Sequence, residues 1–130
     1  MEPTTNHRHI LKVLVVDDER IIADTLKMIL DTSGYEARVA YSGETAVELA
    51  RSFRPDLFIT DVIMGDLNGV DAAIQVRAML PSCKVVLFSG QAGTADLLEQ
   101  ARTEGHHFEI LAKPVHPKVL LAKLSNGMSA

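Results

Sequence analysis

Short apolar runs alternate with longer amphipathic segments along most of this chain. Strand-like runs occur at 11–16, 35–40, 56–60, 84–88 and 108–112. Three of these five runs are nearly continuous in Val, Ile, Leu and Phe instead of alternating with polar residues, as is typical of strands covered on both faces. The pattern therefore predicts a buried parallel sheet.

The segments between the predicted strands repeat apolar residues at helical spacing. In the first segment, one face carries Ile22, Leu26, Ile29 and Leu30. The same spacing predicts further helices at 46–53, 70–77, 95–101 and 119–124. Alternating strands and helices predict one α/β domain with a flavodoxin-like fold, in which a doubly wound, five-stranded parallel sheet has the order 2-1-3-4-5.

The composition agrees with one domain in a reducing compartment. We expect a flexible leader at 1–10, the domain at 11–125 and a tail at 126–130. Cys83 is the single cysteine, so no internal disulfide can form. No apolar run approaches the ~18 residues that cross a bilayer, and the polar start lacks the apolar segment of a secretory signal. We therefore expect a cytoplasmic protein without a membrane partner.

The charge balance argues against nucleic acid as a direct partner. The chain has 13 basic and 17 acidic side chains, which gives a formal net charge of −4. A chain with this balance has little attraction for phosphate backbones. We therefore expect no direct binding to nucleic acid.

Polar residues follow most of the predicted strands. The first strand is followed by Asp17 and Asp18, the third by Asp61, the fourth by Ser89 and the fifth by Lys113. In a doubly wound sheet the first and third strands are neighbours, and ligands bind beyond the carboxyl ends of the strands near that point. The sequence therefore predicts one crevice that holds three carboxylates, a hydroxyl and an ammonium group.

Each of these residues has a simpler explanation when taken alone. A single Asp after a strand is usually a helix cap or a turn former, and a single Ser is usually a cap. Taken together, two carboxylates ~5 Å apart repel by roughly 3 kcal/mol at an effective dielectric constant of about 20. Either one acid keeps its proton, or Lys113 and a divalent cation neutralise the cluster. Hard oxygen ligands without His or Cys favour Mg²⁺.

The same groups suit phosphoryl transfer, in which positioning and charge neutralisation supply most of the catalysis. A carboxylate nucleophile would form an acyl phosphate. Asp61 is the best candidate nucleophile, because its strand lies between the acid pair and the side that carries Ser89 and Lys113.

Four short motifs occur in order along the chain. They are VLVVDDE at the first strand, DLFITDVIMGDLNG around the third, VVLFSG at the fourth and LAKP at the fifth. With them, the chain from 11 to 124 resembles the response regulator receiver domain of two-component signalling. The resemblance implies that Asp61 accepts a phosphoryl group from a phosphohistidine of a sensor histidine kinase or a histidine phosphotransfer protein. It also implies a signalling phosphoacceptor, not a conventional enzyme, that promotes its own phosphorylation and dephosphorylation.

The resemblance also implies a magnesium site. Asp18, Asp61 and the backbone carbonyl of Ile63 would bind Mg²⁺ directly, and Asp17 would act largely through water.

Further expectations from the resemblance concern the phosphoryl group and the output. Ser89 and Lys113 would hold the phosphoryl oxygens, and a cis peptide bond would join Lys113 to Pro114. The surface formed by the fourth helix, the fifth strand and the fifth helix would bind a downstream protein target.

The sequence departs from this family at several positions. Gly65 stands where the family usually has proline, so we expect a more mobile loop after the acceptor. Ile110 stands where the family usually has the aromatic switch residue, and Phe108 lies nearby. The run 105–113 is also one residue longer than is usual, so we expect a bulge or a shifted loop at the fifth strand.

Three alternatives remain at the level of sequence. A flavin- or nucleotide-binding protein of this architecture would have a phosphate loop rich in Gly, Ser or Thr after the first strand, where this chain has Asp-Asp-Glu. A metal-dependent phosphohydrolase would have Asp-x-Asp at that place. A receiver-like interaction module that is never phosphorylated is the remaining alternative.

Overall fold

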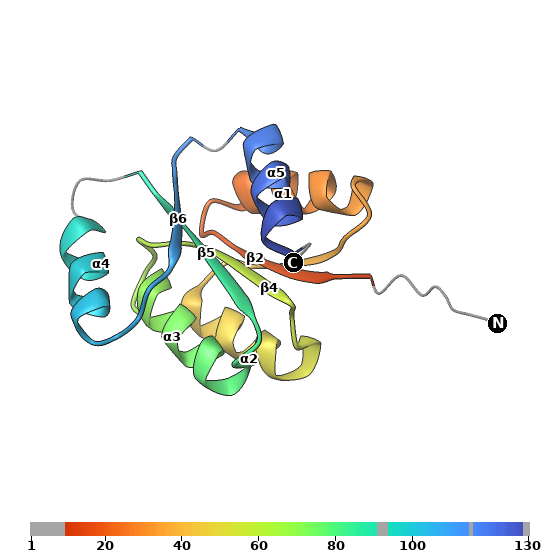
Figure 1. The fold of residues 1–130 in the computed structure, drawn as a ribbon. Coiled ribbons are helices and arrows are strands. Elements are labelled where there is room, and N and C mark those ends of the chain that lie inside the picture. The colour runs from red at the N-terminus through yellow and green to blue at the C-terminus, as the bar shows by residue number, and fades with distance from the viewer. Residues whose placement is uncertain (1–9, 91–93, 115, 129–130) are drawn as a thin grey trace.

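A computed structural model describes residues 10–90, 94–114 and 116–128, in which strands and helices alternate (Figure 1). The strands are β2 (Lys12–Val16), β3 (Glu36–Ala40), β4 (Leu57–Asp61), β5 (Lys84–Ser89) and β6 (Glu109–Ala112). The helices are α1 (Arg20–Thr32), α2 (Gly43–Phe53), α3 (Gly69–Met79), α4 (Thr94–Thr103) and α5 (Pro117–Met128). Each strand begins and ends within one residue of its predicted bounds.

The five parallel strands form one sheet in the order β3-β2-β4-β5-β6. Counted along the chain, this is the predicted order 2-1-3-4-5, and the doubly wound α/β fold is confirmed. Helices α1 and α5 cover one face, whereas α2, α3 and α4 lie on the other (Figure 1). Because β2 and β4 are neighbours, with Val16 paired to Thr60, their carboxyl ends lie side by side.

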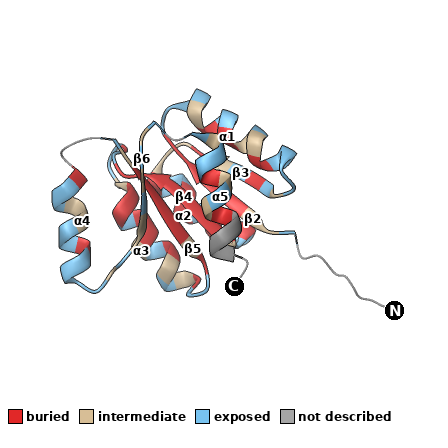
Figure 2. Cartoon of the chain, turned by 45° about the horizontal axis from the view of Figure 1, so that its top comes forward, coloured by how far each residue is buried: buried red, intermediate tan, exposed pale blue. Residues whose placement is uncertain are grey.

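The sheet separates two apolar cores. Val13 and Val15 of β2 pack with α1 and α5, whereas Leu14 and Val16 pack with α2 and α3. All five residues of β4 are buried, which explains its nearly continuous apolar sequence. Figure 2 shows this buried centre of the sheet in red. None of the helices in the described part of the chain has the length and apolar character needed to cross a membrane.

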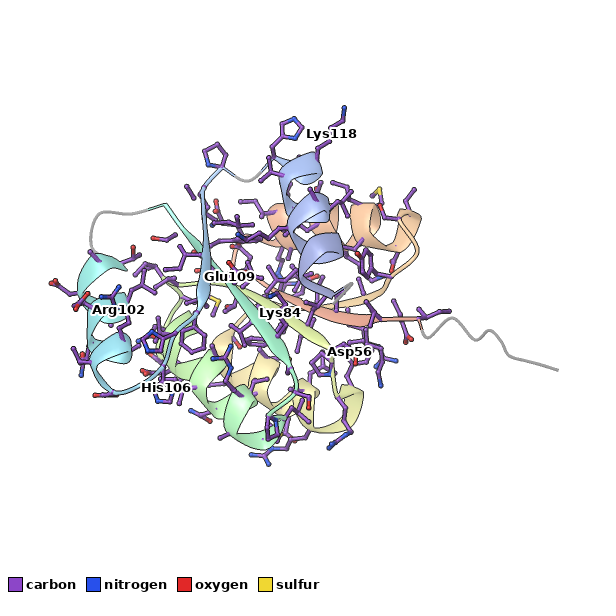
Figure 3. The ribbon with its side chains drawn as sticks, viewed as in Figure 1. Asp56, Lys84, Arg102, His106, Glu109 and Lys118 are labelled. Carbon is purple, nitrogen blue, oxygen red and sulfur yellow. The ribbon has the colours of Figure 1, made fainter. Side chains whose placement is uncertain are left out.

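The edge of the sheet at β6 is less covered, since its residues alternate between half-buried and exposed. Glu109 forms ion pairs with Lys84 of β5 at 3.6 Å and with Lys123 of α5 at 3.0 Å. Figure 3 shows Lys84 and Glu109 on these neighbouring strands. The pairing with β5 is continuous from Glu109 to Ala112, so β6 has no bulge, and a shifted loop before it stays a prediction.

The structure describes the C-terminal end of the predicted domain but only residue 10 of the predicted leader. Residues 1–9 of the expected leader lie outside the described residues. Helix α5 continues to Met128, so residues 126–128 are helical, although the sequence pattern places them in the tail. The last carbonyl groups of a helix can be satisfied by water, so a helix can extend past its last apolar contact. The position of the domain boundary stays a prediction.

Candidate functional site

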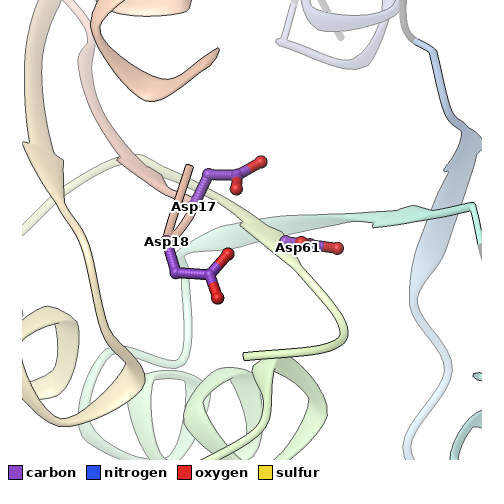
Figure 4. A group of neighbouring side chains, drawn as sticks. All are labelled: Asp17, Asp18 and Asp61. Carbon is purple, nitrogen blue, oxygen red and sulfur yellow. The ribbon is translucent and has the colours of Figure 1, made fainter. Parts of the chain in front are cut away.

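Three carboxylates meet at the carboxyl ends of β2 and β4. Asp17 and Asp18 directly follow β2, and Asp61 is the last residue of β4. Each side chain offers an oxygen, and these oxygens all lie within 4.8 Å of one another. Figure 4 shows the three side chains gathered where the two strands end. The structure therefore brings together the acids that the strand ends predict.

Asp17 is the buried member of this cluster, with 0% of its surface exposed. Its Oδ1 accepts a hydrogen bond from the backbone N–H of Glu19 at 2.9 Å, and its Oδ2 accepts one from Lys113 Nζ at 3.1 Å. A buried carboxylate requires such partners, because an unpaired buried charge is costly. Asp18 differs, because it is exposed and makes no hydrogen bond or ion pair with any residue that the structure describes.

Lys113 follows β6 and bridges the two acidic strand ends. Its Nζ lies 3.1 Å from Oδ2 of Asp17 and 3.1 Å from Oδ2 of Asp61, whereas Oε1 of Glu19 is farther away at 3.9 Å. Burial lowers the pKa of Lys113, but the hydrogen bonds to Asp61 and Asp17 outweigh burial and raise the pKa above its usual value. Lys113 is therefore a stable positive charge, and it is joined to Pro114 by a cis peptide bond, as expected.

Asp61 is 9% exposed, and its pKa is raised above the usual value of an aspartate. Burial is the main cause, the hydrogen bond from Lys113 opposes it, and the negative charge of Asp17 adds to it. The backbone N–H of Ile63 also donates to the Asp61 side chain. Lys113 therefore supplies positive charge to the crowded acids, and the raised pKa makes Asp61 easier to protonate than a solvated aspartate.

The oxygen donors of the cluster suit a hard divalent cation. Three carboxylates face a single bridging ammonium group, so negative charge is in excess when all four groups are ionised. Carboxylate oxygens without His or Cys are the ligands that Mg²⁺ prefers. Ile63 lies in the loop directly after β4 and is half-exposed. The part of its carbonyl in metal binding stays a prediction.

Ser89 ends β5 on the other side of Asp61, but its hydroxyl has a different partner. It is hydrogen-bonded to the hydroxyl of Thr94, the first residue of α4. Gly90 follows Ser89 and lies against Lys113, because a Cβ on Gly90 would be 2.8 Å from the Lys113 Cβ. Thr94 was not found from the sequence, although a Thr at the start of a helical segment is a known signal for a capping residue.

The loop between β4 and α3 is tied to the neighbouring helix α2. The backbone N–H of Leu67 donates to Oε2 of Glu44 at 3.1 Å, and the N–H of Gly69 closes the loop on the carbonyl of Val62 at 2.7 Å. Gly65 lies between these ties, and a Cβ added to it would have no atom within 4 Å. The loop is therefore tied on both sides of Gly65, its greater mobility stays a prediction, and Glu44 is a second residue that sequence reasoning missed.

The aromatic residue near β6 packs against α3 and not against the acidic cluster. The guanidinium group of Arg77 lies 4.6 Å from the centre of the Phe108 ring and also donates to the carbonyl of His107 at 3.2 Å. The His106 ring stacks on the Phe108 ring, with ring centres 6.3 Å apart. Ile110 is 44% exposed and carries no polar group. Phe108 is therefore held in place by its neighbours.

An apolar cavity of about 550 Å³ lies beside the acidic cluster, between α1 and the start of α5. Ile22 and Leu26 of α1 form one wall, Phe88 lies beneath, and Lys113 and Pro114 form the side next to the cluster. The site thus opens beside an apolar surface.

Comparison with known families gives one match along nearly the whole chain. Residues 13–125 match the family described as the response regulator receiver domain. The chain is 30% identical over 115 residues to the chemotaxis protein CheY of Thermotoga maritima, which covers 88% of this chain and 94% of that protein.

Two further proteins are similar to this chain: one is a longer relative in sequence, and the other is a solved structure. The DNA-binding response regulator MtrA of Mycobacterium tuberculosis is 29% identical over 87% of this chain, which spans only 48% of MtrA. A crystal structure of a response regulator receiver domain protein from Clostridium thermocellum is 30% identical, with a TM-score of 0.81 over 92% of this chain and 94% of that one.

Proposed function

This chain belongs to the response regulator receiver domain family of two-component signalling proteins, and from that premise we propose that Asp61 takes a phosphoryl group from a phosphohistidine. The observation that carries the proposal is the cluster of Asp17, Asp18 and Asp61 with Lys113 across it. The proposed domain is 11–125, and the proposed location is the cytoplasm.

The transfer exchanges one bond to phosphorus for another. An Oδ of Asp61 forms the new O–P bond as the N–P bond of the phosphohistidine breaks, and the released imidazole keeps its electron pair. Asp61 must be ionised to act, and Lys113 at 3.1 Å favours the ionised form against the effect of burial. The Asp61 side chain is 12% exposed, so part of it is open to a donor at the end of its strand.

The proposed ligands of Mg²⁺ are Asp18, Asp61 and the carbonyl of Ile63, with Asp17 acting through water. A Mg²⁺ ion held by these residues would offset the negative charge of the phosphoryl oxygens. Asp17 is held by Lys113 and the N–H of Glu19, so it can orient a water without moving. Lys113 and Ser89 are proposed to hold phosphoryl oxygens, and the same groups would promote self-phosphorylation and dephosphorylation.

The proposed partners follow from the family and from the exposed surfaces. The phosphodonor is a sensor histidine kinase or a histidine phosphotransfer protein, which would cover the apolar cavity beside Lys113 as its histidine approaches Asp61. The output face comprises α4, β6 and α5, where Ile110 and Val119 are exposed. Direct binding to nucleic acid is not proposed for this chain.

The test is transfer from a small-molecule phosphodonor in the presence of Mg²⁺, read by intact mass. We expect the wild type and Asp66→Asn to gain one phosphoryl group, and Asp61→Asn and the chelated wild type to gain none. Asp66 is the matched control, because it is an exposed aspartate in the loop after Asp61. A wild type that never gains the group would favour an interaction module that is not phosphorylated, and labelled Asp61→Asn would place the acceptor elsewhere.

A further inference from the structure

A buried threonine hydroxyl lies directly before Asp61 in the chain. Thr60 is 0% exposed, and its Oγ1 donates to the backbone carbonyl of Asp61 at 2.9 Å. The same Oγ1 lies 3.9 Å from Sδ of Met64, which is a weak acceptor. Burying a hydroxyl costs free energy unless it is hydrogen-bonded. These contacts therefore allow a threonine in a strand that is otherwise apolar up to Asp61.

The Thr60 hydroxyl holds one edge of the peptide between Asp61 and Val62. On the other edge, the N–H of Val62 donates to the carbonyl of Phe88 at 3.1 Å. The Asp61 carbonyl also lies against Gly69, where an added Cβ would be 1.9 Å from the carbonyl oxygen. This peptide is therefore fixed on both edges at the end of β4, where Figure 4 shows Asp61 beside the other two acids.

The next peptide, between Val62 and Ile63, is also held on both edges. Its carbonyl accepts from the N–H of Gly69 at 2.7 Å, and its N–H donates to the Asp61 side chain. Val62 and Met64 are 0% and 4% exposed, whereas Ile63 between them is 44% exposed. Two successive peptides are thus fixed before the Ile63 carbonyl, which is a proposed ligand of Mg²⁺.

We propose that Thr60 is a positioning residue whose hydroxyl fixes the direction of the Ile63 carbonyl for Mg²⁺ and of the Ile63 N–H for Asp61. This inference rests on the proposed function. Thr60 is fully buried and is not one of the proposed ligands, so it acts through the peptide that it holds. A buried carbonyl that loses its donor must find another partner, so the segment from Asp61 to Ile63 turns when the hydroxyl is removed.

The first experiment measures Mg²⁺ binding to the full chain by calorimetry. Thr60→Val removes the hydroxyl at nearly constant shape, so we expect about fivefold weaker binding, the factor that one net hydrogen bond supplies. Thr60→Ser keeps the hydroxyl and should bind as the wild type does. Thr103→Val is the matched control, because the Thr103 hydroxyl also donates to a backbone carbonyl, that of Gln100, but at the end of α4.

A second readout needs no metal. Without Mg²⁺, Thr60→Val should speed amide exchange at Ile63, because the bond from this N–H to Asp61 depends on the direction of the peptide. Thr60→Ser and Thr103→Val should leave exchange at Ile63 unchanged. Exchange at Val86, which is buried in the neighbouring strand β5, should stay at the wild-type rate in all three variants. A general loss of packing would instead speed exchange at both positions.

The outcomes separate this inference from the proposed function. A wild type that does not bind Mg²⁺ contradicts the proposed metal site and the inference with it. A wild type that binds, together with equal binding by Thr60→Val, contradicts the role of Thr60 alone. Weak binding by Thr60→Ser also overturns that role, because packing of the Thr60 methyl group would then control the site, and this variant decides the question if Thr60→Val does not fold. Faster exchange at Val86 along with Ile63 overturns it as well.

Discussion

The centre of the sheet and its β6 side differ in how deeply their residues are buried. At the centre, β4 is buried along its whole length and Asp17 is 0% exposed, with both oxygens of that carboxylate paired. On the other side, β6 is half-covered and α4 has only two buried residues within Thr94–Thr103. Fixed charges therefore lie where two helical layers cover the sheet, whereas β6 and α4, which belong to the proposed output face, have few buried contacts.

The ties that hold the β6 side are correspondingly weak. Glu109 is paired with Lys84 and Lys123, and both ion pairs lie near the surface. Such pairs are typically worth about 0–1 kcal/mol. At the centre, breaking a pair would leave a buried charge without its partner, which costs more. The two regions should therefore respond differently to similar substitutions.

The largest expected effect is at Gly69, behind the acidic cluster. A Cβ at this position would lie 1.9 Å from the carbonyl oxygen of Asp61, so the backbone must shift to admit it. We expect Gly69→Ala to lower the free energy of unfolding by about 3 kcal/mol. The control Gly65→Ala, in the same loop but with open space around it, should change stability by less than ~1 kcal/mol. Urea unfolding of both variants measures this, and equal stabilities would show that the centre is not tightly packed.

A smaller loss of stability is expected when a lysine is replaced, and its size should differ between the two regions. Lys113→Met leaves the buried Asp17 charge without its cation, so we expect a loss of about 2 kcal/mol in the free energy of unfolding. Lys123→Met breaks only the exposed pair with Glu109 and should cost less than ~1 kcal/mol. Added Mg²⁺ should restore part of the loss in Lys113→Met and none in Lys123→Met. Equal losses would contradict the contrast between the regions.

The place of the acidic cluster could be predicted from the sequence, because it follows from the order of strands. The alternation of strands and helices predicts which strand ends are neighbours, and hence that Asp17, Asp18 and Asp61 meet. The side chains of two adjacent acids at a strand end lie in different surroundings. Which of the two is buried depends on helix packing, which one sequence does not reveal. The pattern therefore cannot show that Asp17 is buried and Asp18 exposed.

Contacts between distant side chains were the least predictable part of the site. Lys113 was expected beside the phosphoryl group, but its bridge between Asp17 and Asp61 depends on its rotamer and on the space that Gly90 leaves. The bond between Ser89 and Thr94 likewise depends on how α4 packs after the strand. Local pattern carries no information about such packing.

The two regions should also depend on pH with opposite sign. The folded-state pKa of Asp61 is raised from 3.8, so its contribution to stability is present below pH 3.8 and is lost as pH rises through the raised pKa. The pKa of Glu109 is lowered from 4.5, mainly by Lys123, so its contribution is present above pH 4.5 and is lost as pH falls through the lowered pKa.

Thermal unfolding against pH tests this difference. Relative to the wild type, Asp61→Asn should gain stability as pH rises above 3.8, and Glu109→Gln should lose stability above pH 4.5. Parallel pH profiles for the two variants would show that burial at the centre does not control the ionisation of Asp61.

The smallest effect is at Glu44, which ties the loop after Asp61 to α2. Its Oε2 accepts the Leu67 N–H at 3.1 Å at an exposed position, so we expect Glu44→Ala to lower the free energy of unfolding by about 0.5 kcal/mol. Amide exchange at Leu67 should be faster in Glu44→Ala and near the wild-type rate in Glu44→Gln, whose amide oxygen can still accept. Glu48→Ala, one turn farther along α2, is the matched control and should leave Leu67 unchanged. Exchange of Leu67 at the wild-type rate in Glu44→Ala would contradict this role of Glu44. Packing of Leu67 against Gly43 would then be what holds the loop, and the tightly packed centre of the sheet would extend as far as this loop.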